Sequence, residues 1–270
     1  MSLRSYLFVP ADRPARFAKA LAAGADAVIV DLEDAVAPAA KAAARDSLAA
    51  WLEGADAAPV FVRINAPHTP WFADDLRVCA MSAVQGVVVP KAEDTESLAR
   101  AAAAVPGKTL LPLIETAIGF DAVRRLAAAA GVQRLLFGSI DFQADLGIEG
   151  DDDALLFFRS QLVLASRLAG LDAPVDGVTT SFEDDEAVAR DTARARRLGF
   201  GGKLCIHPKQ VGVVNRGFTP SEAEIDWAHC VLAAAAASGG AAVALDGKMV
   251  DAPVLLRARM LLGRAGLASS

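Results

Sequence analysis

Short apolar runs alternate with longer helical segments along most of the chain, and this alternation limits the possible folds more than any other feature. Eight runs rich in Val, Ile, Leu and Phe lie at 5–10, 27–34, 59–65, 86–91, 108–115, 134–141, 173–178 and 202–208. Segments with helical spacing lie between them at 14–24, 39–52, 70–83, 93–104, 117–130, 153–170 and 183–199. The runs do not alternate apolar with polar residues, as expected of strands covered on both faces. Strand–helix repetition of this kind favours a parallel sheet.

Two parallel architectures compete for this pattern, and the first turn separates them. Eight strands within about 200 residues fit a closed (β/α)8 barrel. A doubly wound open sheet commonly begins with a glycine-rich first turn. The first turn here is VPADRP, without GxGxxG. The sequence therefore predicts an α/β protein with a (β/α)8 TIM barrel over residues 1–215.

The last part of the chain, residues 216–270, is predicted to be a helical or lid extension that contacts a neighbouring subunit. SEAEIDWAHCVLAAAAA at 221–237 has Ser221 as N-cap and Glu224 three residues later, the spacing of a capping box. A glycine turn and a short apolar piece follow. The polar segment DGKMVDAP at 246–253 is predicted to be a loop before another helix.

Composition excludes several classes of protein. The net charge is −6 and no basic stripe is present, which argues against a nucleic-acid partner. The three cysteines are widely spaced, form no CxxC pair and are interpreted as free thiols. No stretch approaches the roughly 20 apolar residues of a membrane span, and the N-terminal apolar run is shorter than a secretory signal requires. We expect a cytoplasmic protein with no membrane partner.

Polar residues stand at the ends of most of the predicted strands. The set comprises Asp31, Glu33, Asp34, Arg63, Asn65, Lys91, Glu115, Asp141, His207 and Lys209. The active site of a (β/α)8 barrel lies at the C-terminal ends of its strands. Any one of these residues alone is weak support, since acids often cap the next helix. Together they predict one site at one mouth of the barrel.

Glu115 and Asp141 are the predicted metal ligands. Hard divalent ions such as Mg²⁺ prefer oxygen ligands and are often held by one or two carboxylates. No Cys/His cluster suggests zinc. The alternatives are that Glu115 caps the helix beginning near Thr116 and that Asp141 forms a salt bridge at the barrel rim.

The turn DLED and Arg63 form the second part of the predicted site. Acids as close as Asp31, Glu33 and Asp34 repel one another unless a cation lies nearby. They are predicted to orient metal-bound waters. The alternative for Asp34 is that it stabilises a helix start. Arg63 is predicted to hold a substrate carboxylate bidentately, or alternatively to form a fixed salt bridge with the DLED acids. His207 is interpreted as a structural residue rather than as a general base.

Motifs spread along the chain resemble the citrate lyase β-subunit family, the CitE-like members of the HpcH/HpaI aldolase group, which includes malyl-CoA and citramalyl-CoA lyases. The matching motifs are RSYLFVPADRPARFAKA at 4–20, DLEDAV at 31–36, VRIN at 62–65, VVVPKAED at 87–94, PLIETAIG at 112–119, GSIDFQADLG at 138–147, GGKLCIHPKQ at 201–210 and DGKMVDAP at 246–253. They span nearly the whole chain in order, so the resemblance is specific to the family but not to one substrate.

The resemblance implies a Mg²⁺-binding (β/α)8 barrel, usually a homotrimer. It implies that Glu115 and Asp141 bind the metal, that Glu33 and Asp34 bind metal waters, and that Arg63 contacts the substrate. Asn65 and Lys91 are predicted to bind substrate with Arg63. Asp251 matches an aspartate that reaches the site of a neighbouring subunit and serves in acid–base chemistry.

The resemblance also implies a reaction, the reversible cleavage of a 3-hydroxyacyl-CoA into a 2-keto acid and an acyl-CoA. Citrate lyase β-subunits commonly carry an acid just before the metal-binding aspartate, where this chain has Ile140. That departure favours a stand-alone enzyme acting on a malyl-CoA, citramalyl-CoA or citryl thioester. The alternatives are an HpaI-type aldolase acting on free 2-keto acids and a partner-dependent citrate lyase β-subunit.

Overall fold

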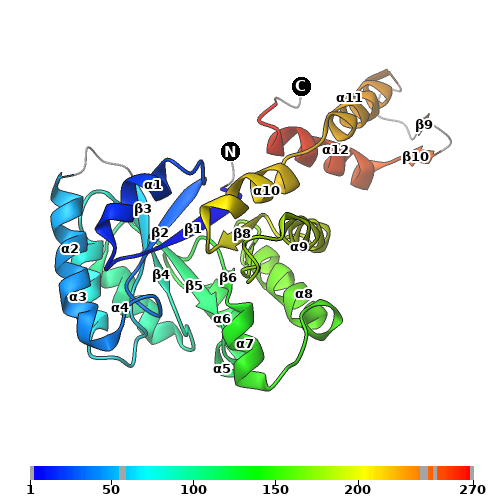
Figure 1. Cartoon of the computed structure of the whole chain (residues 1–270). Helices are drawn as coiled ribbons and strands as arrows, with labels where there is room; N and C mark the ends of the chain where they lie inside the picture. The colour runs from blue at the N-terminus through cyan, green and yellow to red at the C-terminus, as the bar shows by residue number, and fades with distance from the viewer. Residues whose placement is uncertain (1–2, 55–58, 238–242, 246–247, 268–270) are drawn as a thin grey trace. The chain divides into compact units, whose positions relative to one another are not determined.

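Eight parallel strands close into a barrel in sequence order, β1 to β8 (Figure 1). The computed structural model describes residues 3–54, 59–237, 243–245 and 248–267. The strands are β1 Ser5–Pro10, β2 Ala27–Asp31, β3 Val60–Arg63, β4 Val84–Val89, β5 Thr109–Ile114, β6 Leu136–Phe137, β7 Val175–Asp176 and β8 Gly202–Cys205. Closure is made by β1, which pairs in parallel with both β2 and β8. The predicted TIM barrel is therefore confirmed.

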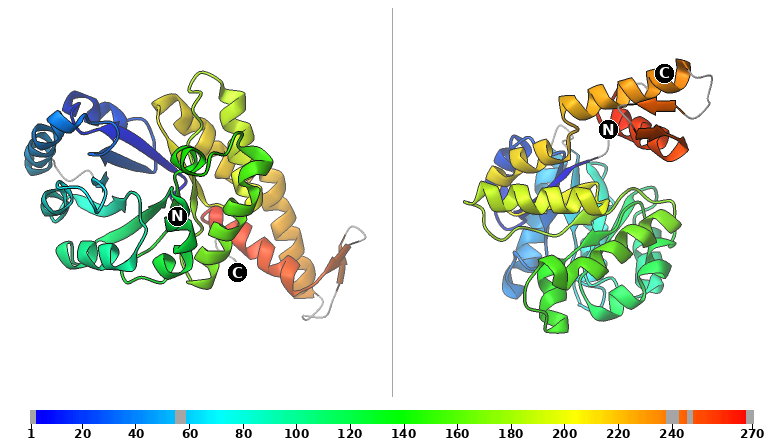
Figure 2. Two further views of the ribbon diagram at one scale, coloured as in Figure 1. Left: turned by 90° about the horizontal axis from the view of Figure 1, so that it is seen from below. Right: turned by 90° about the vertical axis from the view of Figure 1, so that its right-hand side faces the viewer.

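Helices cover the outside of the strands (Figure 2). They are η1 Pro14–Arg16, α1 Phe17–Leu21, η2 Pro38–Ala40, α2 Lys41–Gly54, α3 Phe72–Cys79, α4 Thr95–Ala104, α5 Ala117–Asp121, α6 Val123–Ala127, α7 Ser139–Leu146, α8 Asp152–Leu168, α9 Asp185–Leu198 and α10 Pro208–Phe218. Asp94, Thr116 and Asp184 cap α4, α5 and α9 through side-chain hydrogen bonds to backbone N–H groups. These caps satisfy donors that a helix start leaves unpaired.

Inside the barrel, apolar side chains give way to polar ones toward the C-terminal ends of the strands. Strand side chains alternate with a period of two, so every second residue points inward. Tyr6, Ile29, Phe61 and Leu113 belong to one buried apolar cluster inside the strands. Asp31, Arg63 and Glu115 follow Ile29, Phe61 and Leu113 by two residues each, and they take up the same inward direction, Glu115 directly after the end of β5. The strand periodicity thus delivers a carboxylate, a guanidinium and a second carboxylate to one barrel end.

Several strands are shorter than the predicted runs, and helices α7 and α10 were not predicted. Strand β6 ends at Phe137 and α7 begins at Ser139, so the prediction that Asp141 ends the sixth strand is wrong. Asp141 lies in the first turn of α7, where a carboxylate is favoured by the helix dipole. Strand β8 ends at Cys205, and Lys209 lies in α10 rather than at a strand end. Periodicity cannot distinguish a short buried strand from the buried face of the helix that follows it.

The C-terminal unit begins at Arg216 and is separate from the barrel unit, Leu3–Asn215. It contains α11 Glu222–Ala237, the antiparallel strands β9 Val243–Leu245 and β10 Lys248–Val250, and α12 Ala252–Arg264. The capping box is confirmed, with Ser221 Oγ accepting from Glu224 N at 3.2 Å and Ser221 N donating to Glu224 Oε2 at 2.9 Å. The predicted loop 246–253 is wrong at 248–250, which pair as a strand, while 246–247 lie outside the described residues. Within the described ranges, no helix has the length and apolar character needed to cross a membrane.

Candidate active site

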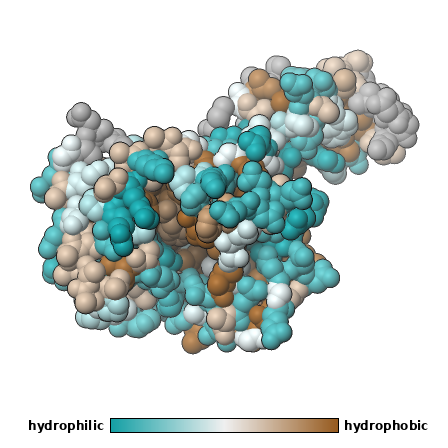
Figure 3. Space-filling view, viewed as in Figure 1, coloured by the Kyte–Doolittle hydropathy of each residue, from teal (hydrophilic) through white to brown (hydrophobic). Residues whose placement is uncertain are grey.

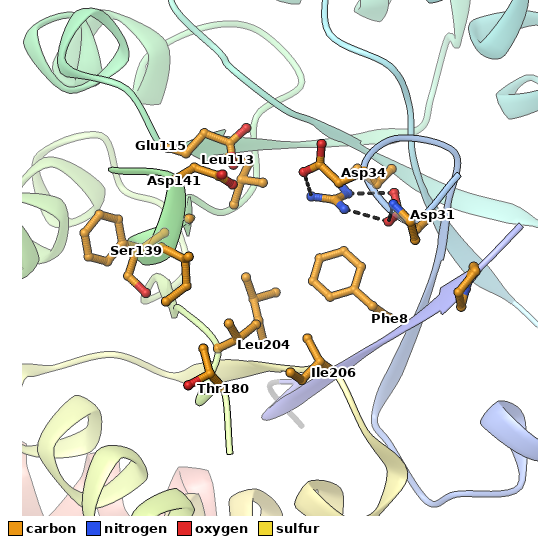
Figure 4. A pocket seen from close by; sticks show the side chains of 17 residues that line it. Phe8, Asp31, Asp34, Leu113, Glu115, Ser139, Asp141, Thr180, Leu204 and Ile206 are labelled. Atoms are coloured by element: carbon orange, nitrogen blue, oxygen red, sulfur yellow. Dashed lines mark hydrogen bonds and ion pairs between the residues drawn. The ribbon is translucent and has the colours of Figure 1, made fainter. Parts of the chain in front are cut away.

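A cavity of ≈ 480 Å³ lies at the C-terminal ends of the barrel strands (Figure 4). Its polar lining comprises Asp31, Asp34, Arg63, Glu115, Ser139, Asp141 and Thr180. Its apolar lining includes Phe8, Leu113, Phe137, Ile140, Val178, Leu204 and Ile206. The space-filling view shows the barrel unit hollowed on one face, with hydrophobic residues inside the hollow and hydrophilic residues around it (Figure 3). Polar groups in a mostly apolar cavity are typical of a small-molecule site.

Arg63 is held by Asp31 in a buried bidentate pair. Asp31 accepts hydrogen bonds from Nε and Nη2 of Arg63 at 2.7 and 2.6 Å. The same carboxylate accepts the backbone N–H groups of Glu33 and Ala35, so it also shapes the DLED turn. The Arg63 guanidinium lies 4.8 Å from the centre of the Phe8 ring. Its bidentate face is thus occupied by protein, as the salt-bridge alternative proposed.

The remaining nitrogen of Arg63, Nη1, points toward two further acids. It lies 3.1 Å from Glu33 Oε2 and 3.4 Å from Asp34 Oδ2. The Glu33 contact is an ion pair without hydrogen-bond alignment. Burial disfavours the charge on Arg63, but Asp31, Glu33 and Asp34 outweigh it and raise the pKa of Arg63. Arg63 therefore stays a permanent cation in the cavity wall, and Nη1 is the nitrogen left outside its bidentate pair with Asp31.

Lys91 joins Glu33 to Glu115. Its Nζ donates to Glu33 Oε1 at 2.8 Å, and its backbone N–H donates to Glu115 Oε1 at 2.8 Å. Burial raises the pKa of Glu33, with Asp34 acting in the same direction and Arg63 and Lys91 opposing it. The side chain of Lys91 lines a smaller neighbouring cavity of ≈ 320 Å³ together with Glu33, Asn65 and Trp71.

Glu115 carries an unpaired oxygen at the cavity. Its side chain is buried, Oε1 is held by Lys91, and Oε2 has no hydrogen-bond partner among the described residues. Burial and the nearby charge of Glu33 raise the pKa of Glu115 to about 8. Thr116, rather than Glu115, caps helix α5, so the capping alternative for Glu115 is wrong. A buried, unpaired carboxylate oxygen is costly without a proton or a cation.

Asp141 faces the same cavity from helix α7. Figure 4 shows the carboxylates of Glu115 and Asp141 close together and directed into the cavity. Asp141 is exposed, and the described part of the chain offers it no salt bridge, which leaves the rim salt-bridge alternative without support. No group of three or more His, Cys, Asp or Glu residues suited to a metal is found among the described residues. Two carboxylates match an ion that completes its shell with water and substrate, as Mg²⁺ does.

Asn65 and Asp251 are both engaged in local hydrogen bonds. Asn65 is buried, and its backbone and side-chain N–H groups both donate to Asp75 Oδ2, at 2.8 and 2.7 Å. Its amide therefore anchors the β3–α3 loop, and its substrate-binding role stays a prediction. Asp251 lies in the C-terminal unit, where its side chain accepts from Val254 N at 3.2 Å and caps α12.

Three further residues shape the cavity and were not singled out from the sequence. Ser139 and Thr180 line it from the segments that follow β6 and β7. Gln210 accepts from the N–H of Ile206 at 2.9 Å and donates to the carbonyl of Thr179 at 2.8 Å, tying two rim loops together. The GSID motif could have indicated Ser139 and the GGKLCIHPKQ motif could have indicated Gln210, whereas nothing in the sequence pattern marks Thr180. His207 stacks on Phe182 with ring centroids 5.0 Å apart, and its structural role stays a prediction.

Comparison with known proteins supplies an independent view of the chain. The family model described as "HpcH/HpaI aldolase/citrate lyase" matches residues 4–208. A "Citrate lyase subunit beta-like protein" from Deinococcus radiodurans is 40% identical, with 96% of each chain covered. A "(3S)-malyl-CoA thioesterase" from Cereibacter sphaeroides is 35% identical, covering 97% of this chain and 94% of the relative. The crystal structure of CitE from Mycobacterium tuberculosis in complex with magnesium, acetoacetate and coenzyme A superimposes with a TM-score of 0.87 and 38% identity, covering 98% of each chain.

Proposed function

The chain belongs to the HpcH/HpaI aldolase/citrate lyase family, and we propose that it is a magnesium-dependent carbon–carbon lyase. It cleaves, reversibly, a 3-hydroxyacyl-CoA of the malyl-CoA, citramalyl-CoA or citryl type into a 2-keto acid and an acyl-CoA. A relative of known structure binds magnesium, acetoacetate and coenzyme A, which are the kinds of metal and ligand that this reaction requires.

One observation carries the proposal: the unpaired Oε2 of Glu115, buried at the cavity beside Asp141. Glu115 and Asp141 would hold Mg²⁺, and Glu33 and Asp34 would hold water molecules beside it. The bound ion would supply Lewis-acid polarisation of the substrate oxygens. The donor set is all oxygen, as Mg²⁺ prefers.

The chain's own residues account for the charges that develop in the reaction. The substrate hydroxyl loses its proton, its C–O bond becomes a carbonyl, and the adjacent C–C bond breaks. The electron pair of that bond passes to the thioester fragment as an enolate. Arg63 lies in the cavity wall as a fixed cation, where it stabilises developing oxyanion charge without needing to reorient. A proton delivered to the enolate carbon completes the acyl-CoA.

We assign that last proton to Asp251 of a neighbouring subunit within a homotrimer. The substitution Asp251→Ser tests the role cleanly, because serine also caps helices well while lacking a carboxyl group. Turnover should fall roughly 100-fold or more with little change in melting temperature. Mixing Asp251→Ser with Glu115→Gln protein under conditions that exchange subunits should restore part of the activity. No recovery would argue against a shared site. The trimer and the cytoplasmic location remain predictions.

Product analysis with purified protein tests the reaction. The chain would be incubated with malyl-CoA, citramalyl-CoA and citryl-CoA, with Mg²⁺ or with EDTA, and the 2-keto acid would be measured. Release of glyoxylate, pyruvate or oxaloacetate that EDTA abolishes supports the lyase. Silence across the panel, with turnover of free hydroxy-keto acids, would favour the HpaI-type aldolase. Activity only after addition of an acyl-carrier subunit would favour the partner-dependent subunit.

A second candidate function is thioester hydrolysis, favoured by the relative named (3S)-malyl-CoA thioesterase. Hydrolysis would leave the C–C bond intact and release malate with free CoA thiol. A thiol reagent added to the malyl-CoA assay distinguishes the two outcomes. Free thiol without glyoxylate would identify a thioesterase, whereas glyoxylate with acetyl-CoA identifies the lyase.

A further inference from the structure

Lys91 has an unusual backbone conformation at the centre of the polar network. Its φ angle is +44°, and no other non-glycine residue in the described part of the chain has a positive φ. Side chains other than glycine rarely adopt this region, and such residues cluster at functional sites. The turn lies between β4, which ends at Val89, and Ala92, whose N–H bonds to Leu113 O on β5 at 3.4 Å.

This conformation directs two donors of one residue at two different acids. The backbone N–H reaches Glu115 Oε1, and the ammonium reaches Glu33 Oε1, both at 2.8 Å. The ammonium also lies 3.9 Å from Glu115 Oε1. With Oε1 engaged, only Oε2 of Glu115 is left facing the cavity.

We propose that Lys91 is a positioning residue with two separate tasks. Its backbone N–H fixes the rotation of the Glu115 carboxylate so that Oε2 is presented to the metal. Its ammonium holds Glu33 against Arg63. It also keeps the buried carboxylates of Glu33 and Glu115 close together, although two such charges would otherwise repel each other. The proposal rests on the Mg²⁺ site proposed above.

The arrangement argues against direct contact with the reacting part of the substrate. The cavity that contains Arg63, Glu115 and Asp141 is not lined by Lys91, which borders the smaller cavity together with Glu33. Its ammonium is already used by Glu33. A residue that binds substrate should chiefly change KM, whereas a positioning residue should chiefly change kcat.

The substitution Lys91→Gly separates the two tasks. Glycine tolerates a positive φ and keeps the backbone N–H, so it removes the ammonium alone. Lys91→Arg keeps a cation within reach of Glu33. Lys108→Gln is the matched control, because Lys108 Nζ is also held by hydrogen bonds, to the carbonyls of Met81 and Val84 at the opposite end of the barrel. Each variant would be compared by thermal melt, by calorimetric titration with Mn²⁺, and by kcat and KM for the thioester that the wild type cleaves.

We expect Lys91→Gly to lower kcat about 10- to 100-fold while KM and Mn²⁺ affinity stay near wild type. Lys91→Arg should recover most of the lost turnover, and Lys108→Gln should match wild type in both assays. An unchanged kcat in Lys91→Gly would overturn the task of the ammonium. A raised KM with unchanged kcat would show that Lys91 binds substrate instead. Loss of Mn²⁺ affinity in Lys91→Gly would overturn the task of the backbone N–H.

The Mn²⁺ titration distinguishes a failure of the Lys91 proposal from a failure of the lyase proposal. If the wild type binds Mn²⁺ but cleaves no thioester, the lyase proposal fails. The Mn²⁺ titration then still tests whether the backbone N–H of Lys91 positions Glu115. In that case Glu115→Gln should abolish Mn²⁺ binding and Lys91→Gly should preserve it. If the wild type binds no Mn²⁺ or Mg²⁺, both proposals are wrong.

Discussion

Buried carboxylates are hydrogen-bonded to different extents on the two sides of the barrel mouth. On the β2–β3 side, Asp31 accepts four hydrogen bonds and pairs with Arg63 in bidentate geometry. On the β5–β6 side, Glu115 has one oxygen without a hydrogen-bond partner among the described residues, and Asp141 faces the cavity from α7. The Asp31–Arg63 pair is fully hydrogen-bonded as folded, whereas Glu115 and Asp141 leave carboxylate oxygens available at the cavity.

Within one ring of residues, this difference separates those that maintain the fold from those available for metal binding and catalysis. A buried pair that is fully bonded sets geometry and is costly to break. A buried carboxylate left short of partners is maintained only where function requires it. The contrast predicts that substitutions on the paired side reduce stability, while those on the unpaired side reduce metal binding and turnover.

The largest expected effect is that of Glu115→Gln on turnover. The amide is a poor Mg²⁺ ligand, and we expect turnover to fall by about 1,000-fold or more, equivalent to about 4 kcal/mol. Folding stability should be unchanged or higher, because Glu115 must keep a proton when it is buried in the metal-free protein, whereas glutamine is neutral without one. Steady-state kinetics and urea unfolding measure the two quantities. Glu96→Gln, at an exposed position in the first turn of α4, is the matched control. Full Mg²⁺-dependent turnover in Glu115→Gln would refute the metal site.

The next effect is that of Asp31→Ala on stability. Removing this carboxylate leaves the Arg63 guanidinium buried without its main partner, which should lower the free energy of unfolding by about 3 kcal/mol. The loss is at the low end of the usual range because Glu33 and Asp34 still lie near Nη1. Chemical denaturation measures it. The double variant Asp31→Ala with Arg63→Met should be more stable than the single variant, since the buried guanidinium is removed together with its main partner and Glu33 keeps its pair with Lys91. A single variant as stable as wild type would contradict the comparison.

A smaller effect should follow from Gly138→Ala, which acts on Glu115 through space. A Cβ atom at Gly138 would lie 2.5 Å from Glu115 Cβ and 2.6 Å from Oε2, so the carboxylate must shift. Displacing a ligand in this way should weaken Mn²⁺ binding about 10- to 100-fold. Calorimetric titration measures the change. Gly263→Ala, in α12 with no atom within 4 Å of the new Cβ, should leave affinity unchanged. Equal affinities in all three proteins would mean that Glu115 is not a ligand.

The smallest effect is the pH dependence of the metal-free protein. Between its ordinary pKa of 4.5 and about 8, folded Glu115 keeps a proton that the unfolded chain has released. The folded state then binds more protons, so this group makes stability fall as pH rises through that window. The melting temperature should decline from pH 6 to pH 8.5 without metal, and less steeply in Glu115→Gln. Mg²⁺ must displace the proton, so its affinity should rise with pH over the same range. A Glu115→Gln slope equal to that of wild type would assign the effect to other groups.

Much of this mouth could be predicted from sequence because the site follows the strand period. Asp31, Arg63 and Glu115 each come two residues after a buried inward-facing residue, so a parallel barrel must bring them together. Asp141 was predicted at the same mouth for the wrong local reason, since it lies on α7 rather than at a strand end. Helix α10 was missed although it begins at Pro208, and proline is common at the first position of a helix.

The sequence by itself determined the barrel, the family and the residues at the strand ends, because these depend on local periodicity and on motifs in order. Only the tertiary structure decided which charge is paired with which. Asp31, rather than a ligand, accepts the two parallel hydrogen bonds of Arg63, and Asp75 accepts the side-chain hydrogen bond of Asn65. Lys91 donates to both Glu33 and Glu115 from a left-handed backbone conformation. Those choices depend on distances of a few ångströms between strands far apart in the chain, and hydrogen bonds and ion pairs form only at such distances.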